Sequence, residues 1–266
     1  MAAKGRAYPR VIGGFRDPSW IFFEIAVPIL NSSAFVFLYR AMHAPDAYVG
    51  FVVLGSAIAA YWANVIWMMA TQLHWDRAEG YLELYILAPV SMMAFLLGMA
   101  AGGLFIASIR AALIAVLLSL IFHVQFTGAN FIGALEAFLI TMVALYGLGM
   151  LLSSLFLFWG REAWQLALAI QEPVYFLTGL NFPLSKLFAT VPGAVSLVSA
   201  LIPISLGLDA LRQYLFPGQL VGVFSAGTEL LLLLGLGVIY ITAAYFMLKR
   251  MEWLARVEAR LSIRWQ

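Results

Sequence analysis

Three acidic residues, Asp76, Glu79 and Glu83, are the carboxylates of this chain whose spacing could bring them together for chemistry. At positions i, i+3 and i+7 they would share one face of a helix. Acid–base catalysis needs a second group that converges on the same point, and no such partner is evident near them. The histidines fall in different loops and span ends, without metal-ligand spacing: His43, His74 and His123. We therefore predict no catalytic residues and no metal site.

Apolar residues form a second stripe on the same predicted helix, residues 72–87. Trp75, Ala78, Leu82 and Tyr85 recur at helical spacing beside the acidic face. Such an amphipathic segment suits the water boundary of a membrane, where a soluble partner could push on it. An ordinary interfacial helix has the same pattern, so both interpretations remain open.

The composition places this segment in a membrane protein. Of 266 residues, 64% are hydrophobic and 11% are charged, whereas soluble domains carry about 25% charged residues. The net charge of +2 gives no reason to expect a nucleic-acid partner. The absence of cysteine excludes disulfides and thiolate metal sites.

Six apolar segments are long enough to cross a bilayer, at about 20 residues each. We expect an all-α integral membrane protein that forms a single unit over residues 1–266. The expected spans are 20–38, 48–70, 91–122, 131–159, 163–180 and 225–248.

Two further elements complete the predicted fold. Residues 8–19 form a basic lead-in that predicts an interfacial elbow, and residues 72–87 form the helix described above. The apolar run 193–202 lies between Pro192 and Pro203 and is too short to cross. We therefore expect a re-entrant segment over 187–203, before the last span, where protein covers the broken backbone.

Basic residues predict the orientation, because cytoplasmic loops are enriched in Lys and Arg. With both termini in the cytoplasm, the inner segments hold eleven basic residues and the outer segments hold three, Arg40, Lys186 and Arg212. We expect a multi-pass protein of the cell membrane. The basic tail, residues 249–266, would lie on anionic lipid headgroups.

Charged residues inside the predicted spans are costly and usually paired. Arg110 lies roughly 28 Å from the inner end of the third span, and Glu136 lies about 8 Å from the outer end of the fourth. Because these depths match, we predict an Arg110–Glu136 pair. The alternative is that Arg110 lines a path for a polar or anionic substrate.

Other polar residues lie within the predicted spans. Glu172, followed by Pro173, falls near the middle of the fifth span. It could mark a hinge or a pathway, or it could make a buried contact between helices. For Asn64 and Gln171, hydrogen bonding between spans is favoured over a place in the pathway.

Several short segments together resemble the type 2 ABC exporter permease family. Residues 79–83 (E-G-Y-L-E) and 88–91 (A-P-V-S), with Gly98 in the next helix, resemble one conserved pattern of that family. Residues 178–185 (T-G-L-N-F-P-L-S) resemble a second, and I-P-I-S at 202–205 with D-A-L-R at 209–212 resembles a third. Tyr81 stands where the family usually has Thr, and Phe188 replaces a frequent Pro.

The resemblance implies a half-transporter that pairs with a second copy or a homologous permease and docks on two ATP-binding subunits. Residues 72–87 would be the coupling helix, with seven residues at the ATPase contact: Trp75, Asp76, Arg77, Glu79, Gly80, Leu82 and Glu83. ATP and Mg²⁺ would be bound by the partner. No lysine of this chain lies in a G-x-x-x-x-G-K-[ST] loop.

We therefore expect ATP-coupled export of a drug, a lipid or a lipid-linked glycan, with the first, second and fifth spans lining the path. The subunit itself would not be an enzyme. The competing expectation is a secondary transporter or channel that works without ATP, since such proteins bind at broken helices.

Overall fold

The computed structural model describes residues 18–81, 91–124, 129–159, 163–191, 193–219 and 222–258. The predicted elbow, 8–19, falls outside this part except for its last two residues, which begin the first helix. The described residues are helical and contain no strand. Their elements are α2 (Pro18–Ala41), α3 (Ala47–Ala63), the π-helix η1 (Asn64–Ala70), α4 (Gln72–Ala78), α6 (Met92–Phe122), α7 (Phe131–Trp159), α8 (Ala163–Leu177), α9 (Leu184–Thr190), α10 (Ala194–Leu201), α11 (Pro203–Leu215) and α12 (Ala226–Glu258).

Five helical stretches in the described part are long and apolar enough to cross a membrane: 21–41, 47–78, 92–122, 131–157 and 226–253. The expected fifth span, 163–180, is shorter than predicted. Its helix α8 has 15 residues, about 22 Å, against about 30 Å of hydrocarbon. A sixth crossing is reached only if the bent pair α10–α11 is counted as one span.

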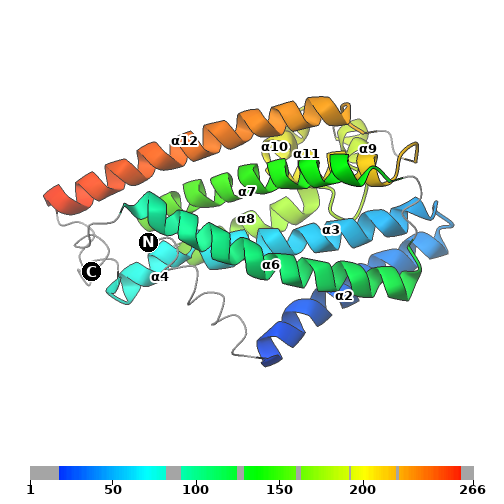
Figure 1. Cartoon of the computed structure of the whole chain (residues 1–266), viewed down its shortest axis with the longest axis horizontal. Helices are drawn as coiled ribbons and strands as arrows, with labels where there is room; N and C mark the ends of the chain where they lie inside the picture. The colour runs from blue at the N-terminus through cyan, green and yellow to red at the C-terminus, as the bar shows by residue number, and fades with distance from the viewer. Residues whose placement is uncertain are drawn as a thin grey trace.

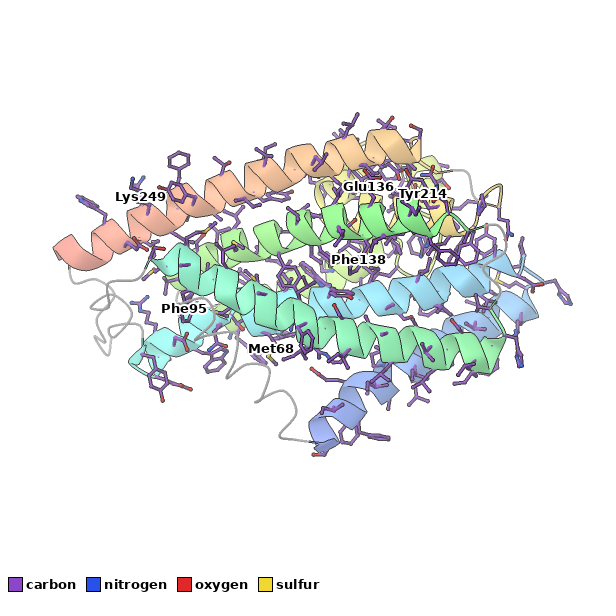
Figure 2. The ribbon with its side chains drawn as sticks, viewed as in Figure 1. Met68, Phe95, Glu136, Phe138, Tyr214 and Lys249 are labelled. Atoms are coloured by element: carbon purple, nitrogen blue, oxygen red, sulfur yellow. The ribbon has the colours of Figure 1, made fainter. Side chains whose placement is uncertain are left out.

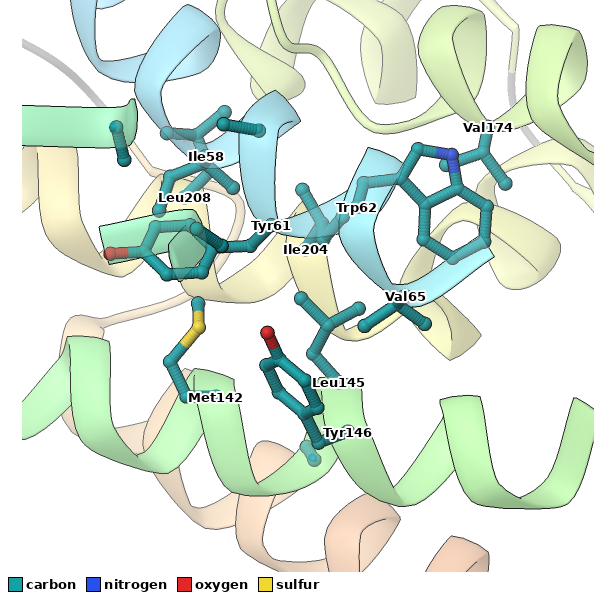
Figure 3. Packing of buried hydrophobic residues seen from close by; sticks show 14 of the residues in the cluster. Ile58, Tyr61, Trp62, Val65, Met142, Leu145, Tyr146, Val174, Ile204 and Leu208 are labelled. Carbon is teal, nitrogen blue, oxygen red and sulfur yellow. The ribbon is translucent and has the colours of Figure 1, made fainter. Parts of the chain in front are cut away.

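Helix α7 forms the centre of the bundle. It packs against α12, α11, η1, α4 and α8, and α3 and α6 pack together beside it (Figure 1). Figure 3 shows the core, where Tyr61 lies by Met142 of α7, Val65 faces Leu145 of α7, and the Trp62 ring lies by Val174 of α8. Since lipid is as apolar as these side chains, close packing rather than removal from water holds such helices together.

Small residues allow the closest approaches between these helices. A Cβ at Gly103 of α6 would lie 2.4 Å from Asn64 Oδ1, and one at Gly149 of α7 would lie 2.8 Å from Val65 Cγ1. Both contacts involve η1, so Gly103 and Gly149 let the π-helix pack closely between α6 and α7.

The outer surface of the bundle is apolar. Leu30 on α2, Ile132 on α7 and Leu231 on α12 are each at least 70% exposed, and they belong to long apolar helices. A surface of this kind is stable in lipid and would aggregate in water. The chain is a multi-pass helical membrane protein.

The broken segment before the last span is longer than the predicted 187–203. It comprises α9, α10 and α11, with a bend of 81° between α10 and α11. The sequence interpretation missed α11, which begins at Pro203 immediately after the extended residue Ile202. Proline at the first helical position starts a helix well, because its missing N–H is not needed there.

The contact between α3 and the turn after α8 is testable. A Cβ at Gly55 would lie 1.7 Å from the carbonyl oxygen of Leu180, a backbone atom that cannot move alone. We expect Gly55→Ala to lower the melting temperature in detergent by several degrees. Gly227→Ala is the matched control, because nothing lies within 4 Å of its added Cβ. Equal melting temperatures for the two variants would contradict this packing.

Candidate functional site

Helix α4 lies at one end of the bundle, the end at which α6 begins and α12 finishes (Figure 1), and it packs on α7 and η1. We call this the α4 end. The helix continues from η1 and stops at Glu79, where Gly80 has φ +82°. That backbone conformation favours glycine, so the turn leaves the Glu79 side chain exposed at the end of the helix.

The predicted acidic face of this helix is only partly confirmed. Asp76 is 2% exposed, and its Oδ1 accepts a 2.8 Å hydrogen bond from Gln72 Nε2. It faces the bundle rather than water, because α4 packs directly on α7. Glu79 is exposed as expected. Leu82 and Glu83 lie outside the described residues.

Two contacts join α4 to the rest of the bundle. The Arg77 guanidinium donates a 3.3 Å hydrogen bond to the carbonyl oxygen of Leu157, in the last turn of α7. On the other side, the Trp75 ring lies 6.2 Å from the ring of Trp164 in α8.

The aromatic contact continues away from α4. Trp164 lies 4.7 Å from Trp67 of η1, centroid to centroid. The indole N–H of Trp67 donates to Gln171 Oε1 on α8. We call Trp75, Trp164, Trp67 and Gln171 the tryptophan relay. It connects the surface helix to the middle of α8 through large, rigid side chains.

The relay ends at a cavity of about 710 Å³ between α2, α3 and α8. Such a volume is typical of small-molecule sites. These are the first, second and fifth predicted spans, the three expected to line a path. Its polar lining includes Asn31, Ser32, Ser56 and Gln171, and its aromatic lining includes Phe35, Tyr175, Phe176 and Phe182. Ser32 and Ser56 are hydrogen-bonded to each other, which joins α2 to α3 at the cavity wall.

Glu172 is the charged residue of this lining. It is exposed rather than buried between helices, and α8 runs through the following Pro173 to Leu177. The structure therefore places Glu172 and Gln171 together at the cavity. Asn64 lies elsewhere, where its Oδ1 accepts a 3.1 Å hydrogen bond from the Tyr146 hydroxyl of α7.

The predicted Arg110–Glu136 pair is wrong. Arg110 of α6 pairs with Glu24 of α2, and Arg110 is buried. Glu136 is exposed on α7, near the opposite end of the bundle from Lys249 (Figure 2). Arg110 and Glu136 do not pair, although their predicted depths along the two helices match. Helix α2 crosses α6 obliquely (Figure 1) and brings Glu24 to Arg110. Neither Arg110 nor Glu136 lines the cavity.

Arg212 of α11 is the residue whose importance the sequence interpretation missed. It is fully buried and donates four hydrogen bonds to backbone carbonyl oxygens. The acceptors are Gly179 at 2.8 Å, Leu180 at 2.8 Å, Phe182 at 3.0 Å and Phe51 of α3 at 2.9 Å. We call this the Arg212 clamp. A signal for it existed in the sequence, since an arginine beside long apolar segments needs acceptors.

The clamp joins two of the segments that carry the family resemblance. Residues 178–185 supply three of its acceptors, and residues 209–212 supply the donor. Leu180, Asn181 and Phe182 of the same turn also line the cavity. The clamp thus fixes one wall of the cavity to α3 and α11.

Within the described part of the chain, no group of three or more His, Cys, Asp or Glu side chains could hold a metal ion. No protein-family model matches the chain, and no curated protein matches it. The fold and the cavity define a multi-pass helical membrane protein with a ligand-sized cavity joined by contacts to a helix at one end.

The Glu24–Arg110 pair gives a prediction about stability. Arg110→Met leaves a largely buried carboxylate without its partner, which costs about 3–5 kcal/mol in buried pairs. We expect a lower melting temperature for this variant. The double variant Glu24→Met with Arg110→Met should recover most of the loss, because neither charge is then left unpaired. Glu136→Gln is the control and should melt like the original. A double variant as unstable as Arg110→Met would contradict the pairing.

Proposed function

We propose that this chain is the membrane-spanning subunit of an ATP-driven exporter, of the type 2 ABC permease class. In this proposal, two permease subunits, either two copies or this chain and a homologue, assemble with two ATP-binding subunits. The α4 end faces the cytoplasm of a cell carrying the protein in its plasma or inner membrane. The cargo is an amphipathic or hydrophobic molecule such as a drug, a lipid or a lipid-linked glycan.

One observation carries the proposal: side-chain contacts run from α4 to the cavity through the tryptophan relay. If α4 only covered the end of the bundle, side-chain contacts leading from it to a ligand-sized cavity would have no purpose. Parts of two of the segments resembling the permease family lie at the two ends of this route. Residues 79–81 follow α4, and residues 180–182 line the cavity.

The relay suggests how work done on α4 would reach the cavity. A partner that closes on ATP would displace α4, and Arg77 would carry the displacement to the end of α7. Trp75 would carry it to Trp164 on α8 and from there to Trp67 on η1. A π-helix has looser hydrogen bonding than an α-helix and is frequent at functional sites. In η1 it offers a place where the second span can change its winding.

Alternating access needs two states that differ little in free energy, so that ATP and cargo shift their populations. Helix α8 is suited to move because it has few contacts. It packs mainly on α7, η1 and α10 and meets α4 through the Trp75–Trp164 contact, whereas the Arg212 clamp holds the turn beyond its end. Rotation of α8 about that turn would change the width of the cavity.

A secondary transporter is the competing proposal, and one feature favours it. The 81° break between α10 and α11 resembles the discontinuous helices at which such proteins bind ions and substrates. The cavity, however, lies between α2, α3 and α8 rather than at this break. Transport that persists after ATP depletion and follows an ion gradient would decide for this alternative.

The partner contact is tested with Glu79→Arg. Glu79 is exposed at the end of α4, so reversing its charge should disturb the docking surface without unfolding the bundle. We expect at least a tenfold loss of co-purifying ATPase from mild detergent, which corresponds to about 1.4 kcal/mol. Asp46→Arg is the matched control, because Asp46 is an exposed acid at the other end of the bundle. If both variants retain the ATPase equally, or if none co-purifies with the original chain, the proposal fails.

The relay is tested with Trp164→Ala in the assembled complex. Loss of this ring breaks the contacts to both Trp75 and Trp67. We expect transport to fall at least tenfold while basal ATP hydrolysis persists, since the ATPase remains docked. Trp253→Ala is the control, because Trp253 is an exposed tryptophan of α12 outside the relay. Equal transport by the two variants would show that the relay carries no motion.

A further inference from the structure

The cavity between α2, α3 and α8 has an uneven distribution of charge. Among the described residues that line it, Glu172 is the charged one, and none is a Lys, Arg or His. Among the described residues, the Glu172 carboxylate has neither an ion pair nor a hydrogen bond. Glu24 of α2 differs from Glu172, because the charge of Glu24 is neutralised by its ion pair with Arg110.

A carboxylate at membrane depth is costly without a partner and marks a functional position by default. Helix α8 is shorter than a full span, but it packs against α7 and η1, which belong to helices long and apolar enough to cross. The cost would be removed by a positive charge on a bound molecule. An anionic ligand would increase it, because the carboxylate would repel the ligand in a medium of low dielectric constant.

The walls around Glu172 favour the same kind of ligand. Tyr175 and Phe176 follow it on α8, and the Phe176 ring lies 6.5 Å from the ring of Phe182. Aromatic faces attract cations, and the attraction is stronger when the cation is desolvated. Rings also bury the apolar body of a ligand. Gln171 and Asn31 supply amide groups for polar substituents.

We propose that this cavity binds an amphipathic cation, with the positive charge at Glu172 and the apolar body against Phe35, Tyr175, Phe176 and Phe182. This inference rests on the proposed function when the cation is taken as cargo. It narrows the cargo from any amphipathic molecule to one that carries a positive charge. Anionic lipids and acidic glycans are then excluded from this site.

The test measures binding directly, without ATP, on the full chain purified in detergent. Radiolabelled tetraphenylphosphonium is the probe, and equilibrium dialysis gives its dissociation constant. We expect Glu172→Gln to weaken binding at least tenfold and Glu172→Asp to retain most of it. Glu136→Gln is the control, because Glu136 is an exposed acid outside the cavity.

A second pair of probes separates charge from hydrophobicity. Triphenylphosphine oxide, which is neutral, should bind the original chain and Glu172→Gln equally. Tetraphenylborate, which has nearly the shape of the cation but a negative charge, should bind the original chain more weakly than Glu172→Gln. Tetraphenylphosphonium binding unchanged by Glu172→Gln, or tetraphenylborate binding the original chain more tightly than tetraphenylphosphonium, would overturn the inference.

The outcome is independent of the partner subunit. Charge-dependent binding without a co-purifying ATPase would support the cation site and refute the exporter proposal. A co-purifying ATPase, together with tetraphenylphosphonium binding that Glu172→Gln leaves unchanged, would support the exporter proposal and refute the cation site.

Discussion

The structure depends on the way one buried arginine satisfies the backbone of a tight turn. Residues 178–183 leave α8 and reverse toward α9, so several carbonyl oxygens there have no helical partner. Arg212 donates to three of them and to Phe51 of α3. A planar guanidinium can serve four acceptors at once, whereas a lysine ammonium has three donors and no planar geometry. The turn, α3 and α11 are therefore held as one unit, with Gly55 permitting the close approach of Leu180.

This rigid unit contrasts with the opposite end of α8. There the helix is held by tilted and edge-on contacts between tryptophan rings and by the hydrogen bond from Trp67 to Gln171, not by a clamp of charged hydrogen bonds. Helix α8 is fixed at one end by the clamped turn and contacts α4 near its other end, so it can pivot about the fixed end. The cavity lies beside this helix, so small displacements of α4 would alter its walls. The π-helix η1 is the part of the second span whose winding can change. It packs closely against Gly103 of α6 and Gly149 of α7.

Charge within the bundle follows from the low dielectric constant of the membrane. Arg110 and Glu24 join α6 to α2 and neutralise each other, while Arg212 uses carbonyl dipoles. Glu172 instead faces a cavity that contains polar and aromatic groups but no described cation. The difference between Glu172 and the other three residues separates charges that hold the fold from one that can take part in binding.

The sequence by itself determined the class of protein and the approximate position of most spans. Long apolar segments must be helical in lipid, because every backbone group has to be satisfied within the segment, and their lengths follow from the bilayer. The broken segment and the amphipathic helix after the second span were also predictable from local pattern. Tertiary structure decided the partners. Arg110 met Glu24 and not Glu136 because α2 crosses obliquely, and Asp76 was buried because α4 packs on α7. The Arg212 clamp, the length of α8 and the cavity at Glu172 depend on contacts between residues far apart in the chain, which periodicity along one helix cannot specify.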